Sequence, residues 1–141
     1  MAWRVRAFDG FEAWGWRMHV HSRTPSILII EDEPILQLAY LDMIESWNWK
    51  SAGTAATMPA ALLLVETSSF DAAILDGELR GESSEPVAER LLELHLPFVT
   101  ISATPRSRLC SCQCAGSCVL SKPVREDALR HELETALKGD C

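Results

Sequence analysis

The chain has 141 residues, of which 48% are hydrophobic and 23% are charged. This length accommodates one domain with a full core, and the composition is that of an ordinary soluble globular protein. The formal net charge of −7 argues against a nucleic-acid partner, because contact with phosphates requires a basic surface. No apolar run approaches the roughly 18 residues of a membrane-spanning helix, so we expect no membrane association.

The first 25 residues differ in character from the rest of the chain. They contain three of the five tryptophans and show no sustained periodicity, so we expect residues 1–25 to form a poorly ordered extension. A partner-binding arm is the alternative, and a natural start at Met18 would remove most of the segment. A secretory signal is not expected, because Asp9, Glu12 and Arg17 interrupt every apolar stretch. The domain itself is expected to span residues 26–141.

Five cysteines are present, and four of them lie between positions 110 and 118. This crowding differs from the spread-out pattern of a disulfide-stapled secreted domain, so we expect a cytoplasmic protein with reduced thiols. Thiolates this close together could bind Zn²⁺ or form a redox-sensitive disulfide. The spacing is poor for a zinc site, however, and small residues in a variable helix are the simpler interpretation.

From Ser26 onward, short apolar runs alternate with segments of helical periodicity. Continuous apolar runs at 27–30 and 72–75 predict strands that are buried on both faces of a parallel sheet, and residues 98–101 predict a further strand that is entered through Pro97. A weaker strand is predicted at 50–54, ended by Gly53, and a fifth strand at 118–121. Residues 105–116 should form a helix or an irregular substitute.

Four further helices are predicted from the spacing of apolar residues. They begin near Pro34, after an N-cap at Thr57, after an N-cap at Ser83 or Ser84, and shortly before Leu129. The positions expected to face the core are Leu36, Tyr40, Met43 and Trp47 in the first, Met58, Ala61, Leu62 and Val65 in the second, Val87, Ala88, Leu91 and Leu92 in the third, and Leu129, Leu133, Ala136 and Leu137 in the last.

Five βα units in series predict an α/β fold with a doubly wound five-stranded parallel sheet and helices on both faces. In such sheets the functional site lies beyond the carboxyl ends of the strands, at the point where the strand order reverses. Polar residues follow four of the predicted strands directly: 31–33 after the first, Asp76 after the third, Ser102 after the fourth and Lys122 after the fifth. We expect them to share one crevice.

Clustered carboxylates repel one another unless a cation compensates them. Mg²⁺ is the natural compensation, because it accepts one or two carboxylates together with water and phosphate oxygens. Lys122 adds a compact positive charge suited to a phosphoryl oxygen. A carboxylate beside Mg²⁺ and a lysine is equipped for in-line phosphoryl transfer, so we predict this chemistry at Asp76. Asp71 is the nearest rival, but it precedes its strand and should lie at the opposite end of the sheet.

The sequence resembles the response-regulator receiver family over nearly all of residues 26–138. The resemblance rests on four stretches: Ile-Leu-Ile-Ile-Glu-Asp-Glu-Pro at 27–34, Ala-Ile-Leu-Asp at 73–76, Thr-Ile-Ser-Ala at 100–103 and Leu-Ser-Lys-Pro at 120–123. Each stretch alone is weakly specific, whereas all four in this order are strongly specific. The resemblance implies a flavodoxin-like (βα)5 receiver fold, and the loop after Asp76 is similar to that of stand-alone, single-domain receivers.

The resemblance also implies a metal site. Asp32 would bind Mg²⁺ directly, and Glu31 would assist through water. Asp76 would be both a metal ligand and the phospho-acceptor, and the backbone carbonyl of Glu78 would complete the site.

For the phosphoryl group, the resemblance implies that Asp76 attacks a phosphohistidine and forms an acyl phosphate. Ser102 would hydrogen-bond the phosphoryl group and move towards it on activation. Lys122 would pair with a phosphoryl oxygen, and in this family the bond that follows, here to Pro123, is usually cis. One departure concerns Val119, which stands where many receivers have a Tyr or Phe whose rotamer reports the phosphorylation state.

The expected function is that of a switch in a two-component phosphorelay. A sensor histidine kinase or a histidine phosphotransfer protein would phosphorylate Asp76, and we expect no output domain after Lys138. Signalling would then occur by binding an unidentified protein target, and the only chemistry would be self-phosphorylation and self-dephosphorylation. The alternatives are a degenerate receiver that acts as a phosphorylation-independent, thiol-sensing adaptor and, more remotely, a small phosphatase-like enzyme with Glu78 as its acid/base group.

Overall fold

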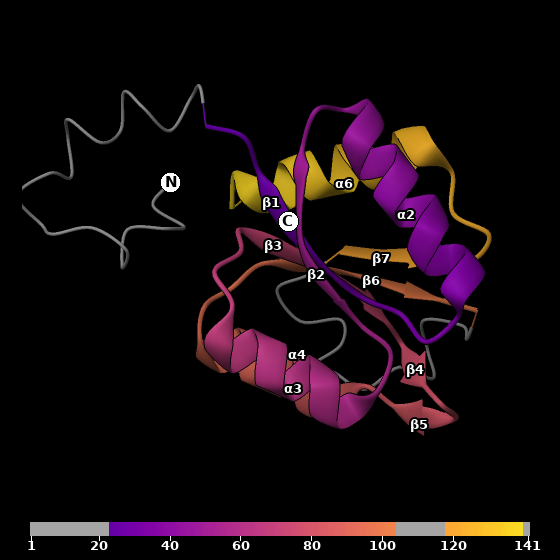
Figure 1. Cartoon of the computed structure of the whole chain (residues 1–141), viewed down its shortest axis with the longest axis vertical. Coiled ribbons are helices and arrows are strands. Elements are labelled where there is room, and N and C mark those ends of the chain that lie inside the picture. Colours follow the sequence, from indigo (N-terminus) through magenta and orange to yellow (C-terminus); the bar gives the residue numbers. More distant parts are fainter. Residues whose placement is uncertain (1–22, 104–117, 140–141) are drawn as a thin grey trace, which may run out of the picture.

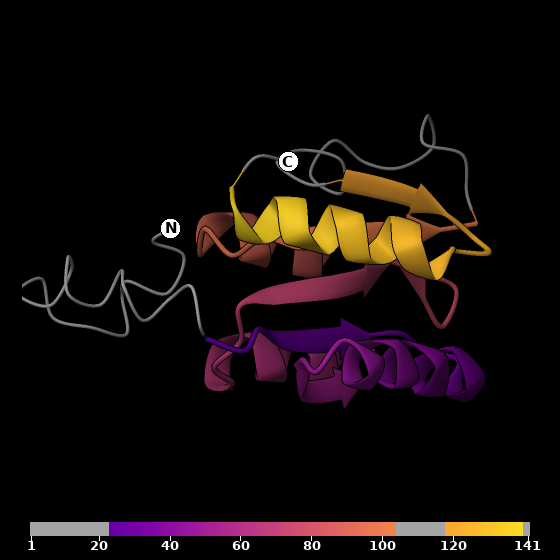
Figure 2. The ribbon, with the colours of Figure 1, turned by 90° about the horizontal axis from the view of Figure 1, so that it is seen from above.

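Five parallel strands form the central sheet of the protein, in the order β2-β1-β3-β6-β7 (Figure 1). The computed structural model describes residues 23–103 and 118–139. The strands are β1 (Ser26–Ile30), β2 (Lys50–Ala55), β3 (Ala72–Asp76), β6 (Phe98–Ser102) and β7 (Cys118–Ser121). Seen from above, the arrows of β1, β3 and β7 all point the same way (Figure 2). The predicted doubly wound parallel sheet is therefore confirmed.

Within the described ranges, helices pack against both faces of this sheet (Figure 1). Helices α2 (Pro34–Ser46) and α6 (Glu126–Leu137) lie on one face, and α3 (Met58–Thr67) and α4 (Glu85–Glu93) lie on the other. Strand β1 shows why both faces are apolar, because successive side chains of a strand point in opposite directions. Ile27 and Ile29 pack in the layer under α2 and α6, whereas Leu28 and Ile30 pack in the layer under α3 and α4.

The order of the strands determines where a site can form. The chain passes from β1 to β2 on one side and then crosses to β3 on the other side of β1. The connections that leave β1 and β3 therefore run in opposite directions, which opens a crevice at the carboxyl ends of these two strands.

Within the described ranges, the predicted elements agree with the structure except at two places. Gly53 does not end its strand: it lies inside β2 with a φ of +141°, where the register with β1 skips one residue. Glycine tolerates the backbone conformation of such a bulge, so the strand continues to Ala55. The second difference is a short antiparallel ribbon, β4 (Glu78–Leu79) and β5 (Glu82–Ser83), which the sequence analysis did not predict.

The core-facing helix positions are mostly confirmed. All four predicted positions of α6 are buried, as are three of the four in α4. In α2 the fully buried residues are Tyr40 and Ile44, and Ile44 was absent from the predicted face. None of the helices in the described part of the chain has the length and apolar character of a membrane-spanning segment.

Three sequence-based predictions fall wholly or mostly outside the described ranges. They are the N-terminal extension, of which residues 1–22 are not described, the helix at 105–116, and most of the cysteine cluster. Cys118 is described, and it is half-buried at the start of β7. The structure gives Cys118 as disulfide-bonded, which differs from the expected reduced thiol. Sequence spacing alone could not distinguish these two states.

The N-terminus of α3 provides a test of the predicted cap. The Thr57 side chain accepts a hydrogen bond from the Ala60 backbone N–H at 3.2 Å. Replacing Thr57 with alanine leaves this N–H without its protein acceptor, so we expect Thr57→Ala to lower the free energy of unfolding by about 1 kcal/mol. Urea unfolding should show that Thr57→Ser, which keeps the hydroxyl, is close to the wild type. Equal stability of the alanine and serine variants would contradict this role.

Candidate functional site

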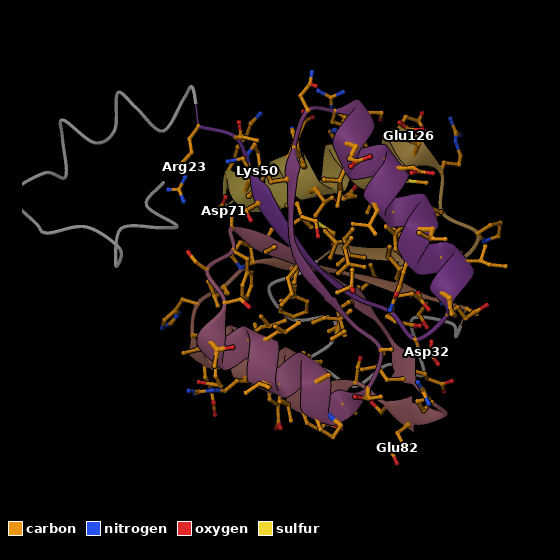
Figure 3. The ribbon with its side chains drawn as sticks, viewed as in Figure 1. Arg23, Asp32, Lys50, Asp71, Glu82 and Glu126 are labelled. Carbon is orange, nitrogen blue, oxygen red and sulfur yellow. The ribbon has the colours of Figure 1, made fainter. Side chains whose placement is uncertain are left out.

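A pocket of about 220 Å³ lies at the carboxyl ends of the strands. The side chains that the sequence analysis assigned to this edge line it together: Asp32, Asp76, Ser102 and Lys122, with Glu33, Glu78, Gly81 and Ala103. Figure 3 shows Asp32 and Glu82 at this end of the sheet and Asp71 with Arg23 at the opposite end. Four strand ends that are far apart in the sequence thus contribute to one site.

Three carboxylates gather at this edge of the sheet, and two of them, Asp32 and Asp76, line the pocket. Glu31 is 1% exposed and Asp76 is 5% exposed, and Asp32 is partly buried beside them. One oxygen from each of the three lies within 4.8 Å of the other two. Side chains of like charge rarely approach so closely in a buried place without a compensating cation.

Lys122 supplies one compensating charge from the opposite wall. Its Nζ lies 3.1 Å from Asp76 Oδ2 and 3.3 Å from Glu31 Oε1. Burial of Lys122 lowers its pKa, but the charge and the hydrogen bond of Asp76 outweigh burial, so the pKa of Lys122 is raised overall. The ammonium group is therefore fully charged at neutral pH. The peptide bond between Lys122 and Pro123 is cis, as predicted.

Backbone N–H groups fix the direction of each carboxylate. Glu78 N–H donates to Asp76 Oδ1 at 3.1 Å, and Glu33 N–H donates to Glu31 Oε2 at 3.0 Å. Arg80 N–H donates to Asp32 Oδ2 at 2.9 Å from the turn of the β4–β5 ribbon. These bonds orient the three carboxylates without adding another side chain to the pocket.

The pKa values of the neighbouring residues Glu31 and Asp32 are shifted in opposite directions. Burial, the largest cause, and the adjacent Asp76 together raise the pKa of Glu31 to about 7, although the hydrogen bond from the Glu33 amide and the charge of Lys122 act to lower it. Partial burial also acts to raise the pKa of Asp32, but the hydrogen bonds from the Arg80 amide and from Glu31 outweigh it, so the pKa of Asp32 is lowered. At neutral pH Asp32 is ionised, whereas Glu31 retains a substantial protonated fraction.

The donor set fits Mg²⁺. Carboxylate oxygens are hard ligands, and Mg²⁺ usually binds one or two of them while keeping several water molecules. Asp32 and Asp76 would bind the ion directly, and Glu31 would support them from the buried side of the cluster. A divalent cation would also relieve the repulsion between Glu31 and Asp76, which adds to burial in raising the pKa of Glu31.

Each predicted site residue can be compared with its position in the structure. Glu31, Asp32, Asp76, Ser102 and Lys122 come together as predicted, and Glu78 lines the same pocket. Asp71 lies at the opposite end of β3, where its carboxylate accepts the Ser26 N–H at 2.8 Å and pairs with Arg23. It is fully buried in this structural role and remote from the pocket.

Two contacts to the site were not predicted. Gln37 of α2 donates from its side chain to the Glu31 carbonyl at 2.5 Å. Arg80 contributes its main chain because Arg80 and Gly81 have φ values of +54° and +81°, which form a tight hairpin turn. An Arg-Gly pair between two short polar runs was a signal for such a turn, whereas the contact from Gln37 left no signal in the sequence pattern.

The fold and site together define a doubly wound α/β domain with an acidic pocket and an opposing lysine. Among solved structures, SdrG from Sphingomonas melonis Fr1 is similar, with 38% identity over 82% of this chain and 97% of that chain and a TM-score of 0.70. The REC domain of the PhyR response regulator from Erythrobacter litoralis has 28% identity, coverage of 84% and 93%, and a TM-score of 0.73.

A CheY-like receiver domain protein from Methanospirillum hungatei JF-1 has 16% identity, coverage of 84% and 97%, and a TM-score of 0.75, and therefore supports the fold alone. No protein-family model matches the chain, and no curated protein matches it significantly. On its similarity to the solved structures, the chain belongs to the response-regulator receiver domains. Receiver domains are modules of two-component signalling rather than enzymes with an external substrate.

The raised pKa of Glu31 predicts how pH changes the stability of the metal-free protein. The folded state keeps a proton on Glu31 up to a pH of about 7, whereas the unfolded chain releases it near the ordinary value of 4.5. The free energy of unfolding should therefore fall as the pH rises between these two values. Glu31→Gln cannot ionise, so it should escape this loss and gain on the order of 1–3 kcal/mol relative to the wild type above the upper value.

The measurement is urea unfolding of the wild type and Glu31→Gln in a chelator, below 4.5 and above 7, the two pKa values that bound the effect. Comparing the two proteins cancels the titration of other groups. If the difference in the free energy of unfolding between the two proteins does not change with pH, ionisation of Glu31 does not destabilise the folded state.

Proposed function

We propose that this protein is a phosphorylation-dependent switch that accepts a phosphoryl group on Asp76. The observation that carries the proposal is that the buried carboxylate of Asp76 contacts a lysine and a backbone amide and lies beside the expected metal ligand. Lys122 lies 3.1 Å from one oxygen of Asp76, and the other oxygen accepts the Glu78 N–H at the same distance. Asp32, the expected metal ligand, lies within the same cluster.

The proposed reaction is transfer from a phosphohistidine to Asp76. A carboxylate oxygen of Asp76 forms a bond to phosphorus while the bond between phosphorus and the histidine nitrogen breaks. The imidazole leaves with the electron pair of that bond, and Asp76 becomes an acyl phosphate. Mg²⁺, when bound, supplies charge neutralisation for the carboxylates and the phosphoryl oxygens.

The chain's own residues account for the remaining requirements. Lys122 neutralises negative charge at the phosphoryl group, and its raised pKa keeps it protonated for this purpose. The Glu78 amide fixes the orientation of Asp76, so the nucleophile does not need to reorganise before attack. We assign Ser102, which lines the pocket, to a hydrogen bond with the bound phosphoryl group.

The proposed output passes through β7. Ser102 and Ser121 are register partners, and Lys122 N–H donates to the Ser102 carbonyl at 3.0 Å. A movement of Ser102 or Lys122 towards the phosphoryl group would therefore pull directly on the end of β7. Partners in this proposal are a sensor histidine kinase or a histidine phosphotransfer protein and an unidentified protein target, and the protein acts in the cytoplasm.

A phosphorylation-independent adaptor is the second candidate. One observation favours it: Val119, half-buried in β7 opposite Thr100, has no aromatic ring whose rotation could report phosphorylation. The two candidates differ in whether Asp76 takes a phosphoryl group at all, so one experiment separates them.

The experiment is intact-mass analysis after incubation with acetyl phosphate and Mg²⁺. We expect the wild type to gain one phosphoryl group, and we expect no gain without Mg²⁺ or in Asp76→Asn. A folded wild-type protein that binds no Mg²⁺ and gains no phosphoryl group would favour the adaptor.

Asp71→Asn is the matched control for the acceptor. It makes the same chemical change one strand length away, at a carboxylate that is also buried. We expect Asp71→Asn to be less stable by about 1–3 kcal/mol, because it weakens the pair with Arg23 and the bond from Ser26. It should nevertheless gain the phosphoryl group as the wild type does, and loss of labelling in a folded Asp71→Asn variant would contradict the assignment of Asp76.

A further inference from the structure

Ser84 is a fully buried polar residue that the proposed mechanism does not use. It follows the β4–β5 ribbon and stands immediately before α4. Its hydroxyl donates a hydrogen bond to the backbone carbonyl of Asp76 at 2.6 Å, across eight residues of sequence. Ser84 therefore contacts the main chain of the residue proposed to accept the phosphoryl group.

The position of Asp76 in the sheet gives this bond its importance. The register between β1 and β3 ends at the pair Ile30 and Leu75, one residue before Asp76. On the other side, Gly77 N–H donates to the Ile101 carbonyl of β6 at 2.9 Å. A buried carbonyl requires a donor, and beyond the end of the β1 ladder the Ser84 hydroxyl provides one.

The backbone of Ser84 closes the same loop. Its N–H donates to the Gly77 carbonyl at 3.0 Å, and its own carbonyl accepts the N–H groups of Val87 and Ala88 at 3.0 and 3.1 Å. The segment 76–84, which carries Glu78 and the ribbon, is thus bonded at both ends. One residue joins the end of β3, the loop and the first turn of α4.

The Ser84 hydroxyl does not make the hydrogen bond that is usual for a serine at the start of a helix. Ser84 occupies the N-cap position of α4, where a serine side chain ordinarily accepts an N–H of the first helical turn. In α4 the N-cap side chain makes no such bond, and the neighbouring Ser83 Oγ instead accepts the Glu85 N–H at 3.2 Å. The exposed Ser83 thus accepts a hydrogen bond from the first turn of α4, whereas the hydroxyl of the buried Ser84 donates to Asp76.

We propose that Ser84 is a positioning residue for the acceptor and metal site. It holds the main chain at Asp76 and Gly77, so that the Glu78 N–H meets Asp76 Oδ1 and the Glu78 carbonyl is available to Mg²⁺. This role rests on the proposed function for its effect on phosphoryl transfer, but its effect on the affinity for Mg²⁺ is independent of that function.

The test compares three variants of the full chain. Ser84→Ala removes the hydroxyl and keeps the backbone bonds, and Ser84→Thr restores a hydroxyl. Ser83→Ala is the matched control, because it also removes one serine hydroxyl bond at the start of α4 but does not touch Asp76. Each is measured for the Mg²⁺ dissociation constant by titration with the metal alone, for the rate of phosphorylation by acetyl phosphate at saturating Mg²⁺, and for the thermal unfolding midpoint.

We expect Ser84→Ala to weaken Mg²⁺ binding and to slow phosphorylation at saturating Mg²⁺, each by about tenfold, as is typical when a group that orients a ligand is lost. Ser83→Ala should change neither quantity, and Ser84→Thr should recover both. If the added methyl group prevents Ser84→Thr from folding, the comparison of the two alanine variants decides the question.

Wild-type values of both quantities in Ser84→Ala would overturn the positioning role, and so would equal losses in Ser83→Ala and Ser84→Ala, since these would indicate a general effect on α4. If the wild type takes no phosphoryl group, the proposed function fails, but the Mg²⁺ titration still decides the role of Ser84 towards the metal site. Unchanged Mg²⁺ affinity in Ser84→Ala would overturn that role as well.

Discussion

The confinement of three carboxylates around one ammonium group is the constraint on which the rest of this structure depends. Glu31 and Asp76 are almost completely buried, and Lys122 forms an ion pair with both. Burial and the neighbouring Asp76 make ionisation of Glu31 unfavourable, and together they raise its pKa to about 7. In the proposed function, a second cation would relieve this cost and a negatively charged phosphoryl group would use the charge of Lys122.

The surrounding structure holds this unfavourable arrangement in place. The carboxylates stand at the ends of β1 and β3, two central strands whose apolar residues are fully buried. Backbone amides of Glu33, Glu78 and Arg80 then fix the three side chains. Main-chain donors suit this purpose, because they are rigid and add no further charge. The stability of the apolar sheet offsets the electrostatic cost at its edge.

The β4–β5 ribbon gives this receiver a particular local architecture. It brings the Arg80 amide to Asp32 and is closed by Ser84, so the loop contacts both Asp32 and Asp76. On the other side of the pocket, Ser102 and Lys122 connect to β7, where Val119 occupies the middle of an edge strand. In the proposed switch, a change at the site would therefore pass through the backbone of β7, because Val119 has no aromatic ring that could rotate.

The sequence by itself determined the fold class, the order of the strands along the chain and the polar side chains that four strand ends bring together. These features are local: buried parallel strands are continuous apolar runs, and their carboxyl ends are marked by the polar residues that follow, from Asp32 to Lys122. Only the tertiary structure decided which contacts orient those residues. Gly53 continues a strand through a bulge, Gln37 and Arg80 reach the site, and Ser84 bonds to Asp76 instead of capping α4. Each of these depends on two segments meeting in space, and a hydrogen bond between distant segments leaves no periodic pattern in either of them.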